Sequence, residues 1–263
     1  MHNIGIVGTG YAGQKILELL SDEPEFKVAV KCDSKSLDIE KLNNTDLVFL
    51  AVPHGISKQL AAKINTKIID LTADHRLTHT YGLPEINKNN IIKADFIANP
   101  GCYATACLLA TYPIKENIKE VVFDCISGYS GAGKNNPFDY KENIIAYNLT
   151  DHFHIKEIEK ILGIKVSFTP HVVNTFQGLM CTAHIKLKEN LTDIKDIYKS
   201  FYKDTKTIIT DNTPCTKDTT NTPYCHIGGF EGDKDHLVII SVIDNLMKGA
   251  ASQAIENAKL MLK

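Results

Sequence analysis

The chain has 263 residues, of which 43% are hydrophobic and 23% charged, and its formal net charge is -2. This composition is typical of a folded globular protein and excludes a disordered or fibrous chain. A near-neutral charge also argues against a nucleic-acid partner, because binding to a run of phosphates requires a basic face. The longest apolar run, residues 47–52, is much shorter than the ~20 residues of a membrane span, so we expect a soluble protein without a membrane partner.

The seven cysteines show no C-x-x-C spacing, which indicates free thiols in a reducing compartment. No basic region or cleavage site of a secretory signal precedes the first apolar segment. We therefore expect a cytoplasmic protein in which each cysteine is either a small buried residue or a reactive group.

Short apolar runs alternate with helical patterns in the first part of the chain. The apolar runs cover residues 4–7, 28–30, 47–52 and 68–71, and the helical patterns cover 11–20 and 56–64. Such alternation is typical of βαβ units on a parallel sheet. It predicts a dinucleotide-binding domain of the Rossmann type.

Longer strands follow from about residue 121. We predict strands at 121–126, 180–187 and 237–243, helices at 155–162 and 192–202, and a last helix at 248–262 that returns to the first domain. Apolar and polar residues alternate in 180–187, which favours a half-buried antiparallel strand. The fold class is therefore α/β, with residues 1–101 and 244–263 as the Rossmann domain. Residues 102–243 form a catalytic and oligomerisation domain of α+β type with a mainly antiparallel sheet.

Gly8, Gly10 and Gly13 form a G-x-G-x-x-G pattern between a predicted strand and a predicted helix. Glycine at these positions lets a pyrophosphate approach the backbone N–H groups at a helix N-terminus. A tight turn in a protein without a ligand is the alternative, but the strand-to-helix context favours a dinucleotide site.

The choice between NAD and NADP is left open by the residues after the second predicted strand. Asp33 stands where a carboxylate can hold the ribose hydroxyls of NAD. Ser34 and Lys35 follow it directly, and a hydroxyl with an ammonium would suit the additional phosphate of NADP.

Cys102 follows Pro100 and Gly101 and precedes a helical pattern that begins at Ala104. A thiol at a helix N-terminus has a lowered pKa, because the N–H groups and the helix dipole stabilise the thiolate. The same N–H groups can receive the oxyanion of a tetrahedral intermediate. We expect the other cysteines to be buried structural residues: Cys32, Cys107, Cys125, Cys181, Cys215 and Cys225.

A thiolate beside a nicotinamide defines a reaction class. Cysteine adds to an activated acyl carbon, phosphate leaves, a hydride reduces the thioester, and the thiohemiacetal collapses to an aldehyde. The collapse requires proton transfer, so a histidine must lie within reach.

Five segments carry a resemblance to a known family. NPGCYAT, SGYSGAGK, DHFHIKEIEKILG, FTPHVVNTFQGL and DNLMKGAASQAIENA together resemble the N-acetyl-gamma-glutamyl-phosphate reductases of arginine biosynthesis. The resemblance spans nearly the whole chain, although the chain is shorter than is usual for the family. It implies NADPH-dependent reduction of N-acetyl-L-glutamyl 5-phosphate to the 5-semialdehyde in the cytoplasm by a homo-oligomer, either a dimer or a tetramer.

The resemblance also assigns roles to individual residues. It implies Cys102 as the nucleophile, Lys134 as a contact of the acyl phosphate, and Asn245 and Lys248 as residues near the nicotinamide and pyrophosphate. It implies cofactor contacts from Gly8, Gly10, Tyr11 and Gly13 in the first loop. A second glycine-rich loop, with Ser127, Ser130, Gly131 and Gly133, is implied to lie against the cofactor and the active site, and Ser130 and Gly131 are predicted to bind the cofactor.

Three histidines compete for the acid/base role. His152 and His154 match the paired histidines of the family, and His171 follows Pro170 in another matching segment. We predict His154 as the proton donor and the other two as residues that place the substrate. The H-x-H pair could also bind a metal, but no further ligands suggest themselves, so we expect no metal.

The remaining substrate contacts are predicted from side-chain chemistry. Arg76 can hold the substrate carboxylate through two parallel hydrogen bonds, with a surface salt bridge as the alternative. Gln177 is assigned to the acetamido group, and Asn99 of the N-P-G segment is included among the substrate contacts.

Two other functions stay open. Semialdehyde dehydrogenases that act on aminoadipyl or aspartyl phosphates share the chemistry, and one methylene is worth only ~1 to 3 kcal/mol of discrimination. A dinucleotide-sensing protein without catalytic activity would keep the fold and not the reaction.

Overall fold

The computed structural model describes residues 1–33, 36–133 and 139–263. Ser34, Lys35 and Lys134, which we predicted to contact the cofactor or substrate, therefore lie outside the described residues. The chain divides into two compact units, one formed by Met1–Gly101 with Ala250–Lys263 and the other by Cys102–Gly249. The second crossing between them falls after Gly249, whereas we predicted it after residue 243.

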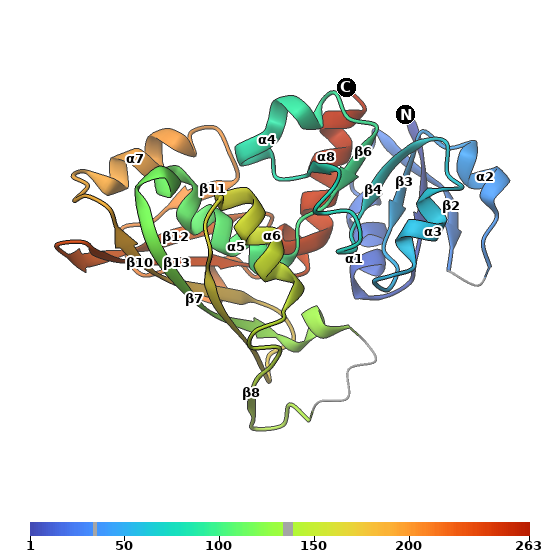
Figure 1. The fold of residues 1–263 in the computed structure, drawn as a ribbon. Helices are drawn as coiled ribbons and strands as arrows, with labels where there is room; N and C mark the ends of the chain where they lie inside the picture. Colours follow the sequence, from blue (N-terminus) through green and yellow to red (C-terminus); the bar gives the residue numbers. More distant parts are fainter. Residues whose placement is uncertain (34–35, 134–138) are drawn as a thin grey trace. The chain divides into compact units, whose positions relative to one another are not determined.

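The first unit is built on a parallel sheet of six strands in the order β2-β1-β3-β4-β6-β5 (Figure 1). The strands are β1 (His2–Val7), β2 (Phe26–Cys32), β3 (Leu47–Leu50), β4 (Lys67–Asp70), β5 (Thr80–Tyr81) and β6 (Phe96–Ala98). The chain starts in the middle of the sheet and crosses over at β3, which is the topology of a dinucleotide-binding fold. The predicted Rossmann domain is confirmed.

Helices cover both faces of this sheet. The five helices are α1 (Tyr11–Leu20), α2 (Ile39–Asn43), α3 (Ser57–Ala61), α4 (Pro84–Ile91) and α8 (Ser252–Met261). One apolar cluster joins α1 and α8 to Ile4, Phe49 and Ile69, and a second joins α2 and α3 to Val48 and Leu50. Consecutive buried residues of β3 thus serve opposite faces, which explains why its sequence is continuously apolar rather than alternating.

The second unit contains a mixed sheet of seven strands in the order β11-β12-β13-β10-β7-β9-β8. Its strands are β7 (Ile118–Gly128), β8 (Ile144–Ala146), β9 (Ser167–Val173), β10 (Leu179–Leu187), β11 (Thr207–Ile209), β12 (Cys225–Asp233) and β13 (His236–Ile243). Four neighbouring pairs are antiparallel, and the pairs β7 with β9 and β11 with β12 are parallel. The prediction of a mainly antiparallel sheet is confirmed.

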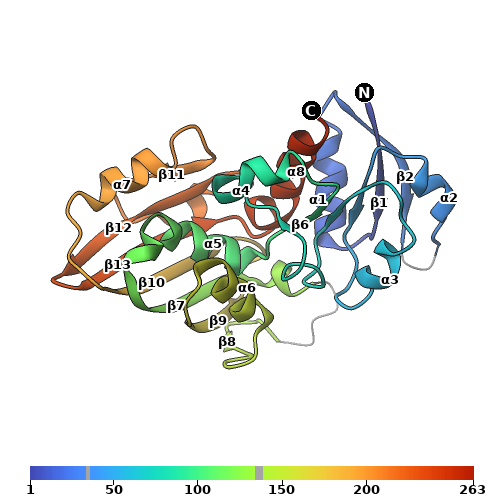
Figure 2. The same cartoon turned by 45° about the horizontal axis from the view of Figure 1, so that its top comes forward.

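Helices α5 (Cys102–Thr111) and α6 (Phe153–Leu162) lie together on one face of the second sheet (Figure 2). Every residue of α5 after Cys102 is buried, so this helix is a core element rather than an amphipathic one. Strand β7 alternates between Val121, which is buried, and Val122, which is exposed, and it keeps this alternation to Ile126. The sheet therefore has one face covered by helices and one open face. A third helix, α7 (Ile194–Phe201), contacts β11.

The predicted last helix of residues 248–262 consists of two parts. A π-helical turn over Met247–Ala251 precedes α8. The carboxylate of Asp244 accepts hydrogen bonds from the N–H groups of Leu246 and Met247 at the start of this turn. Among the described residues, no helix has both the length and the apolar character that a bilayer span requires.

Candidate active site

Cys102 is the first residue of α5 and is half-buried. Five of the other cysteines are buried as expected, but Cys215 is exposed, which corrects our expectation for that residue. Its backbone N–H is held by Asp218 in a short 3-10 turn on the surface, so the chain turns there instead of entering the core. Cys102 thus combines a helix N-terminus with partial access, which are the features of a reactive thiol.

The π-helical turn packs directly against Cys102. A Cβ atom added to Gly249 would lie 2.7 Å from the Cβ of Cys102, closer than real Cβ contacts come. The N–H of Gly249 donates to the carbonyl of Asp244, which holds the turn in this position. Glycine at position 249 is therefore required for the backbone to approach the nucleophile.

Asp244 organises the segment between β13 and this turn. Its side chain is fully buried, and its Oδ2 accepts hydrogen bonds from the N–H of Asn221 at 2.7 Å and the Nε2 of Gln177 at 2.8 Å. Four donors in all surround the carboxylate, including those of the π-helical turn. These hydrogen bonds hold the loop between β13 and the π-helical turn in place. Gln177, predicted to bind the acetamido group, is at least in part a structural ligand of this carboxylate.

Asn245 joins the glycine-rich loop to the same segment. Its Nδ2 donates to the Oγ of Ser130 at 2.9 Å, and its Oδ1 accepts from the N–H of Gly178 at 2.8 Å. Gly131 lies beside these groups, since an added Cβ would be 3.4 Å from the Nδ2 of Asn245. Four sequence-predicted residues, Ser130, Gly131, Asn245 and Gln177, are thus brought together by this network. Lys248 is fully buried in the π-helical turn that follows.

The two histidines of the H-x-H segment begin α6 and differ in their bonding. His152 is the N-cap, and its Nδ1 accepts a hydrogen bond from the N–H of His154 at 3.2 Å. An accepting Nδ1 carries no proton, so His152 is neutral. The Nε2 of His154 lies 3.8 Å from Oε2 of Glu157, and both side chains are buried. A carboxylate at this distance stabilises the protonated imidazole, which is the arrangement that an acid/base histidine requires.

Two tyrosine rings pack against the histidines of the H-x-H segment. The ring of Tyr103, which follows Cys102 directly, makes edge-on contacts with the rings of His152 and His154, at centroid distances of 5.9 Å and 5.7 Å. Tyr147 contacts His152 from another side. Burial raises the pKa of Tyr147 to about 12, with a further contribution from negative charge on Cys102. Burial also raises the pKa of Tyr103 well above its ordinary value, so neither phenol can act as a base near neutral pH.

His171 is oriented differently from the other two histidines. It is the register partner of Ile126, which is exposed on the open face of the sheet, and its strand neighbours Pro170 and Val172 are buried on the helix-covered face. The ring of His171 therefore projects to the face opposite α5. Its Nδ1 lies 3.3 Å from the carbonyl oxygen of Cys125, and its own carbonyl accepts a hydrogen bond of 2.7 Å from the hydroxyl of Tyr103. A substrate contact of the His171 ring stays a prediction.

In the first unit, the three glycines of the loop after β1 differ in the space that a side chain would have. A Cβ on Gly8, where φ is +117°, would lie 2.1 Å from the carbonyl oxygen of Ala51, and a Cβ on Gly13 would lie 2.2 Å from that of Gly8. A Cβ on Gly10 would meet no atom within 4 Å. Gly10 is the N-cap of α1 and has no side chain to satisfy the first N–H groups of that helix. Open space beside these N–H groups fits the pyrophosphate of a dinucleotide.

Comparison with known proteins agrees with both units. The chain matches a family model of the semialdehyde dehydrogenase dimerisation domain over residues 102–245 and one of the semialdehyde dehydrogenase NAD binding domain over residues 29–94. An N-acetyl-gamma-glutamyl-phosphate reductase of Halothermothrix orenii is 34% identical, and the alignment covers 99% of this chain and 95% of that protein. One of Methanococcus maripaludis is 36% identical, with 100% and 96% covered. The chain belongs to the N-acetyl-gamma-glutamyl-phosphate reductase family.

Other relatives of the reductase show different extents of similarity. The mitochondrial protein ARG5,6 of Candida albicans is 37% identical, but the alignment covers 98% of this chain and only 36% of that protein. Among solved structures, aspartate semialdehyde dehydrogenase II of Vibrio cholerae has a TM-score of 0.82 at 20% identity, covering 100% of this chain and 98% of that one. The second comparison establishes the shared fold alone.

Arg76 and Asn99 hold the first unit of the reductase together. Arg76 is buried, and its Nε and Nη2 donate to the carbonyl oxygens of Asn99 and Leu71 at 2.9 Å and 3.0 Å. The guanidinium of Arg76 is thus buried rather than at the surface. The side chain of Asn99 bonds to the carbonyl oxygen of Ala250 and to the amide of Asn257. Substrate contacts from these two residues stay predictions.

Sequence reasoning missed several residues of the reductase site. Glu157 stands three residues after His154, which is the spacing that brings two side chains together on a helix, so this pair could have been found from the sequence. The contacts of Asp244 with Asn221 and of Gly249 with Cys102 left no such local signal, because these partners are distant in the sequence. Tyr147 lies five residues before His152, a spacing that predicts no contact outside a regular element.

Proposed function

We propose that the chain catalyses the NADPH-dependent reduction of N-acetyl-L-glutamyl 5-phosphate to N-acetyl-L-glutamate 5-semialdehyde, with release of phosphate, in arginine biosynthesis. The observation that carries this proposal is the half-buried Cys102 at the N-terminus of α5, whose neighbour Tyr103 contacts both His152 and His154. Family membership supports the reaction, since its relatives are named for this activity.

The thiolate of Cys102 adds to the acyl carbon of the substrate and forms the S–C bond. The C–O bond to phosphate then breaks, and phosphate leaves with the electron pair. The N–H groups at the start of α5 stabilise the negative charge on the carbonyl oxygen during this step. The NADPH, when bound, supplies the hydride that reduces the resulting thioester.

His154 moves the proton in the final step. Hydride addition to the thioester leaves an alkoxide on the tetrahedral adduct, and His154 donates a proton to this oxygen. The proton returns to His154 as the C–S bond breaks, which leaves the aldehyde and the thiolate of Cys102. The imidazole of His154 handles this proton, and Glu157 supports its charged form from 3.8 Å. His152 stays neutral and fixes the N-terminus of α6 through its Nδ1, so its role is to position His154.

The cofactor binds to the loop of Gly8, Gly10, Tyr11 and Gly13, with the pyrophosphate in the open space beside Gly10. A preference for NADP over NAD is part of the proposal, through Ser34 and Lys35 as predicted from the sequence. Ser130, Gly131, Asn245 and Lys248 are the further cofactor contacts of this proposal, as the family resemblance implies.

The substrate would be held by Arg76 through its carboxylate, with Asn99, Gln177 and Lys134 as further contacts. A contact from His171 stays a prediction from the sequence. We also propose the cytoplasm as the compartment, in keeping with the free thiols.

A homo-oligomer forms in this proposal through the open face of the second sheet. Val122 and Ile126 on β7 are both 41% exposed, and they share this face with the half-buried Met180 and Ile240. An exposed apolar sheet face of this kind is typical of a contact between copies of a chain. The dimerisation-domain model covers these strands.

A steady-state assay tests the substrate and the cofactor together. The reverse reaction is followed with phosphate, with NADP or NAD, and with the semialdehydes of N-acetylglutamate, N-acetylaminoadipate and aspartate. We expect the highest kcat/KM for N-acetylglutamate semialdehyde with NADP. Preference for either of the other aldehydes would overturn the substrate assignment, and a complete lack of turnover would favour a non-catalytic dinucleotide-sensing protein.

A further inference from the structure

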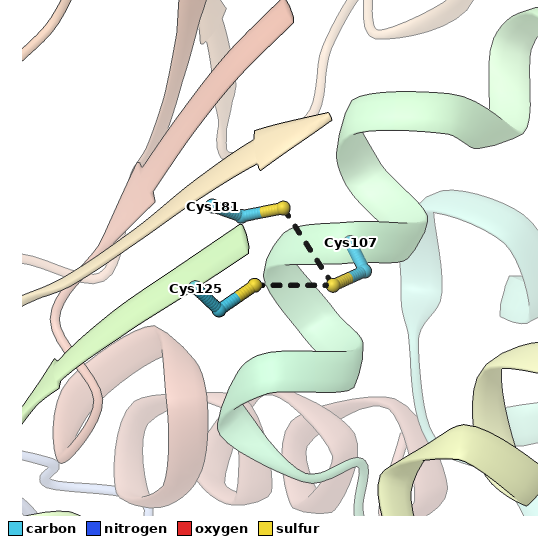
Figure 3. Close-up of side chains that lie close together, drawn as sticks. All are labelled: Cys107, Cys125 and Cys181. Carbon is cyan, nitrogen blue, oxygen red and sulfur yellow. Dashed lines mark hydrogen bonds between the residues drawn. The ribbon is translucent and has the colours of Figure 1, made fainter. Parts of the chain in front are cut away.

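Three cysteine thiols of the second unit meet between α5 and its sheet (Figure 3). The Sγ of Cys107, on α5, lies 3.6 Å from that of Cys125, on β7, and 3.6 Å from that of Cys181, on β10. All three side chains are fully buried. Cys125 and Cys181 are direct register partners in the antiparallel pair of strands, and Cys107 lies over them from the helix.

The spacing of these sulfur atoms fits a metal ion. All the ligand atoms of the cluster lie within 4.8 Å of one another. Metal–sulfur bonds of about 2.3 Å, with the angles of about 120° that three ligands adopt around an ion, place two sulfur atoms about 4.0 Å apart. The separations from Cys107 need to grow by only a few tenths of an ångström to reach this value. Three rigid elements hold the thiols, so little ordering is required when an ion binds.

The number and type of ligands decide which ion fits. Sulfur ligands select soft ions and exclude magnesium and calcium, which bind oxygen. A structural zinc site has four protein ligands, whereas this cluster offers three, and no other His, Cys, Asp or Glu of the described chain joins it. A soft ion that accepts three sulfur ligands is therefore the best match, and Cu(I) is such an ion.

We propose that Cys107, Cys125 and Cys181 form a binding site for a thiophilic metal ion held by three sulfur atoms, with Cu(I) as the ion. Binding forms three metal–sulfur bonds and releases the thiol protons to solvent, and no electron is transferred. The ion would fasten α5 to β7 and β10 in the core of the second unit. The proposal does not depend on the reductase activity.

Each thiol has to lose its proton when it binds the ion. The affinity for Cu(I) is therefore expected to rise with pH.

The test is an anaerobic titration of the full-length, reduced protein with Cu(I) in competition with a chromophoric Cu(I) chelator. Cys102→Ser and Cys215→Ser are introduced together as the background, because these are the two cysteines with solvent access. We expect one tightly bound Cu(I) per chain, a sulfur-to-metal charge-transfer absorption, and three sulfur neighbours in the X-ray absorption spectrum. Binding should also raise the melting temperature, since the ion binds only the folded protein.

Single substitutions to alanine separate the cluster from other sites. Cys107→Ala, Cys125→Ala and Cys181→Ala should each weaken binding by at least ~100-fold, because removing a ligand costs more than removing a residue that only orients one. Cys225→Ala is the matched control, since Cys225 is equally buried but hydrogen-bonds to Ser241. Circular dichroism establishes whether each variant is folded. If an alanine variant does not fold, the Cu(I) titration of the background protein still tests the proposal.

Two results would overturn the proposal. One is a background protein that takes up no Cu(I) in competition with the chelator. Loss of Cu(I) binding in Cys225→Ala alone, with binding kept in the three cluster variants, would have the same meaning. The other is Zn(II) bound as tightly as Cu(I) with four ligands, which would contradict a three-sulfur site.

Discussion

Cys102 is the residue on which the proposed reaction depends, and its replacement gives the first prediction. Cys102→Ser should lower kcat by at least ~1000-fold, because a serine hydroxyl stays protonated where the thiol ionises. The dissociation constant of NADPH should not change, since the glycine loop after β1 is untouched. Cys225→Ser serves as a control for a buried cysteine. Iodoacetamide should label Cys102 faster than exposed Cys215, and equal rates would contradict an activated thiol.

His154 and Glu157 give the second prediction at this scale. His154→Ala should slow turnover by ~100- to 10,000-fold, the usual contribution of general acid–base catalysis. Glu157→Gln keeps the shape of the side chain but removes its charge, so turnover should fall by a smaller factor of ~10- to 100-fold. His171→Ala, on the other face of the sheet, is the comparison. Steady-state kinetics measure all three, and greater damage from His171→Ala would refute the assignment.

At the scale of elements, two glycines in the turn from β1 to α1 are predicted to have different roles, one in NADPH binding and the other in the stability of the fold. Gly10→Ala places a methyl group in open space, so the fold should be unchanged. NADPH should bind ~10- to 100-fold more weakly, because the methyl group keeps the pyrophosphate from one or two charge-assisted hydrogen bonds with the backbone. Gly8→Ala introduces both a contact of 2.1 Å with Ala51 and an unfavourable φ of +117°, so it should destabilise the protein by ~2 to 4 kcal/mol. Isothermal titration and thermal unfolding distinguish the two effects. Equal NADPH affinity in Gly10→Ala and the unsubstituted protein would place the pyrophosphate elsewhere.

Elements were predicted well wherever a periodic apolar pattern was strong. Helix α6 and strand β10 start within two residues of their predicted positions, because amphipathic helices and half-buried strands have clear periods. The strands β5, β8, β11 and β12 were not predicted. The first three have two or three residues each and are defined by hydrogen bonds to a partner strand that lies elsewhere in the sequence. Strand β12 has nine residues, but its glycines and charged residues give it no continuous apolar pattern.

For the whole molecule, the open face of the second sheet predicts how copies of the chain associate. Ile126→Lys places a charge in the middle of this face, where burial of an unpaired ammonium is costly, so the oligomer should dissociate. Leu149→Lys is the control, because Leu149 is 59% exposed in a turn outside the sheet. Sedimentation velocity measures the mass of each variant. An unchanged mass for Ile126→Lys would assign the contact to another surface.

The sequence by itself determined the two fold types and the position of the glycine loop, because each depends on patterns of residues close together along the chain. Five such local segments also indicated the family, and one of them predicted Cys102 as the nucleophile. The tertiary structure decided which side chains meet. It buried Arg76 against backbone carbonyls, turned His171 to the face opposite α5, and brought Gly249 against Cys102. It also assembled three cysteines from a helix and two strands into one cluster. Strand register and helix docking are set by packing between distant segments, and a local pattern carries no information about which distant segment that will be.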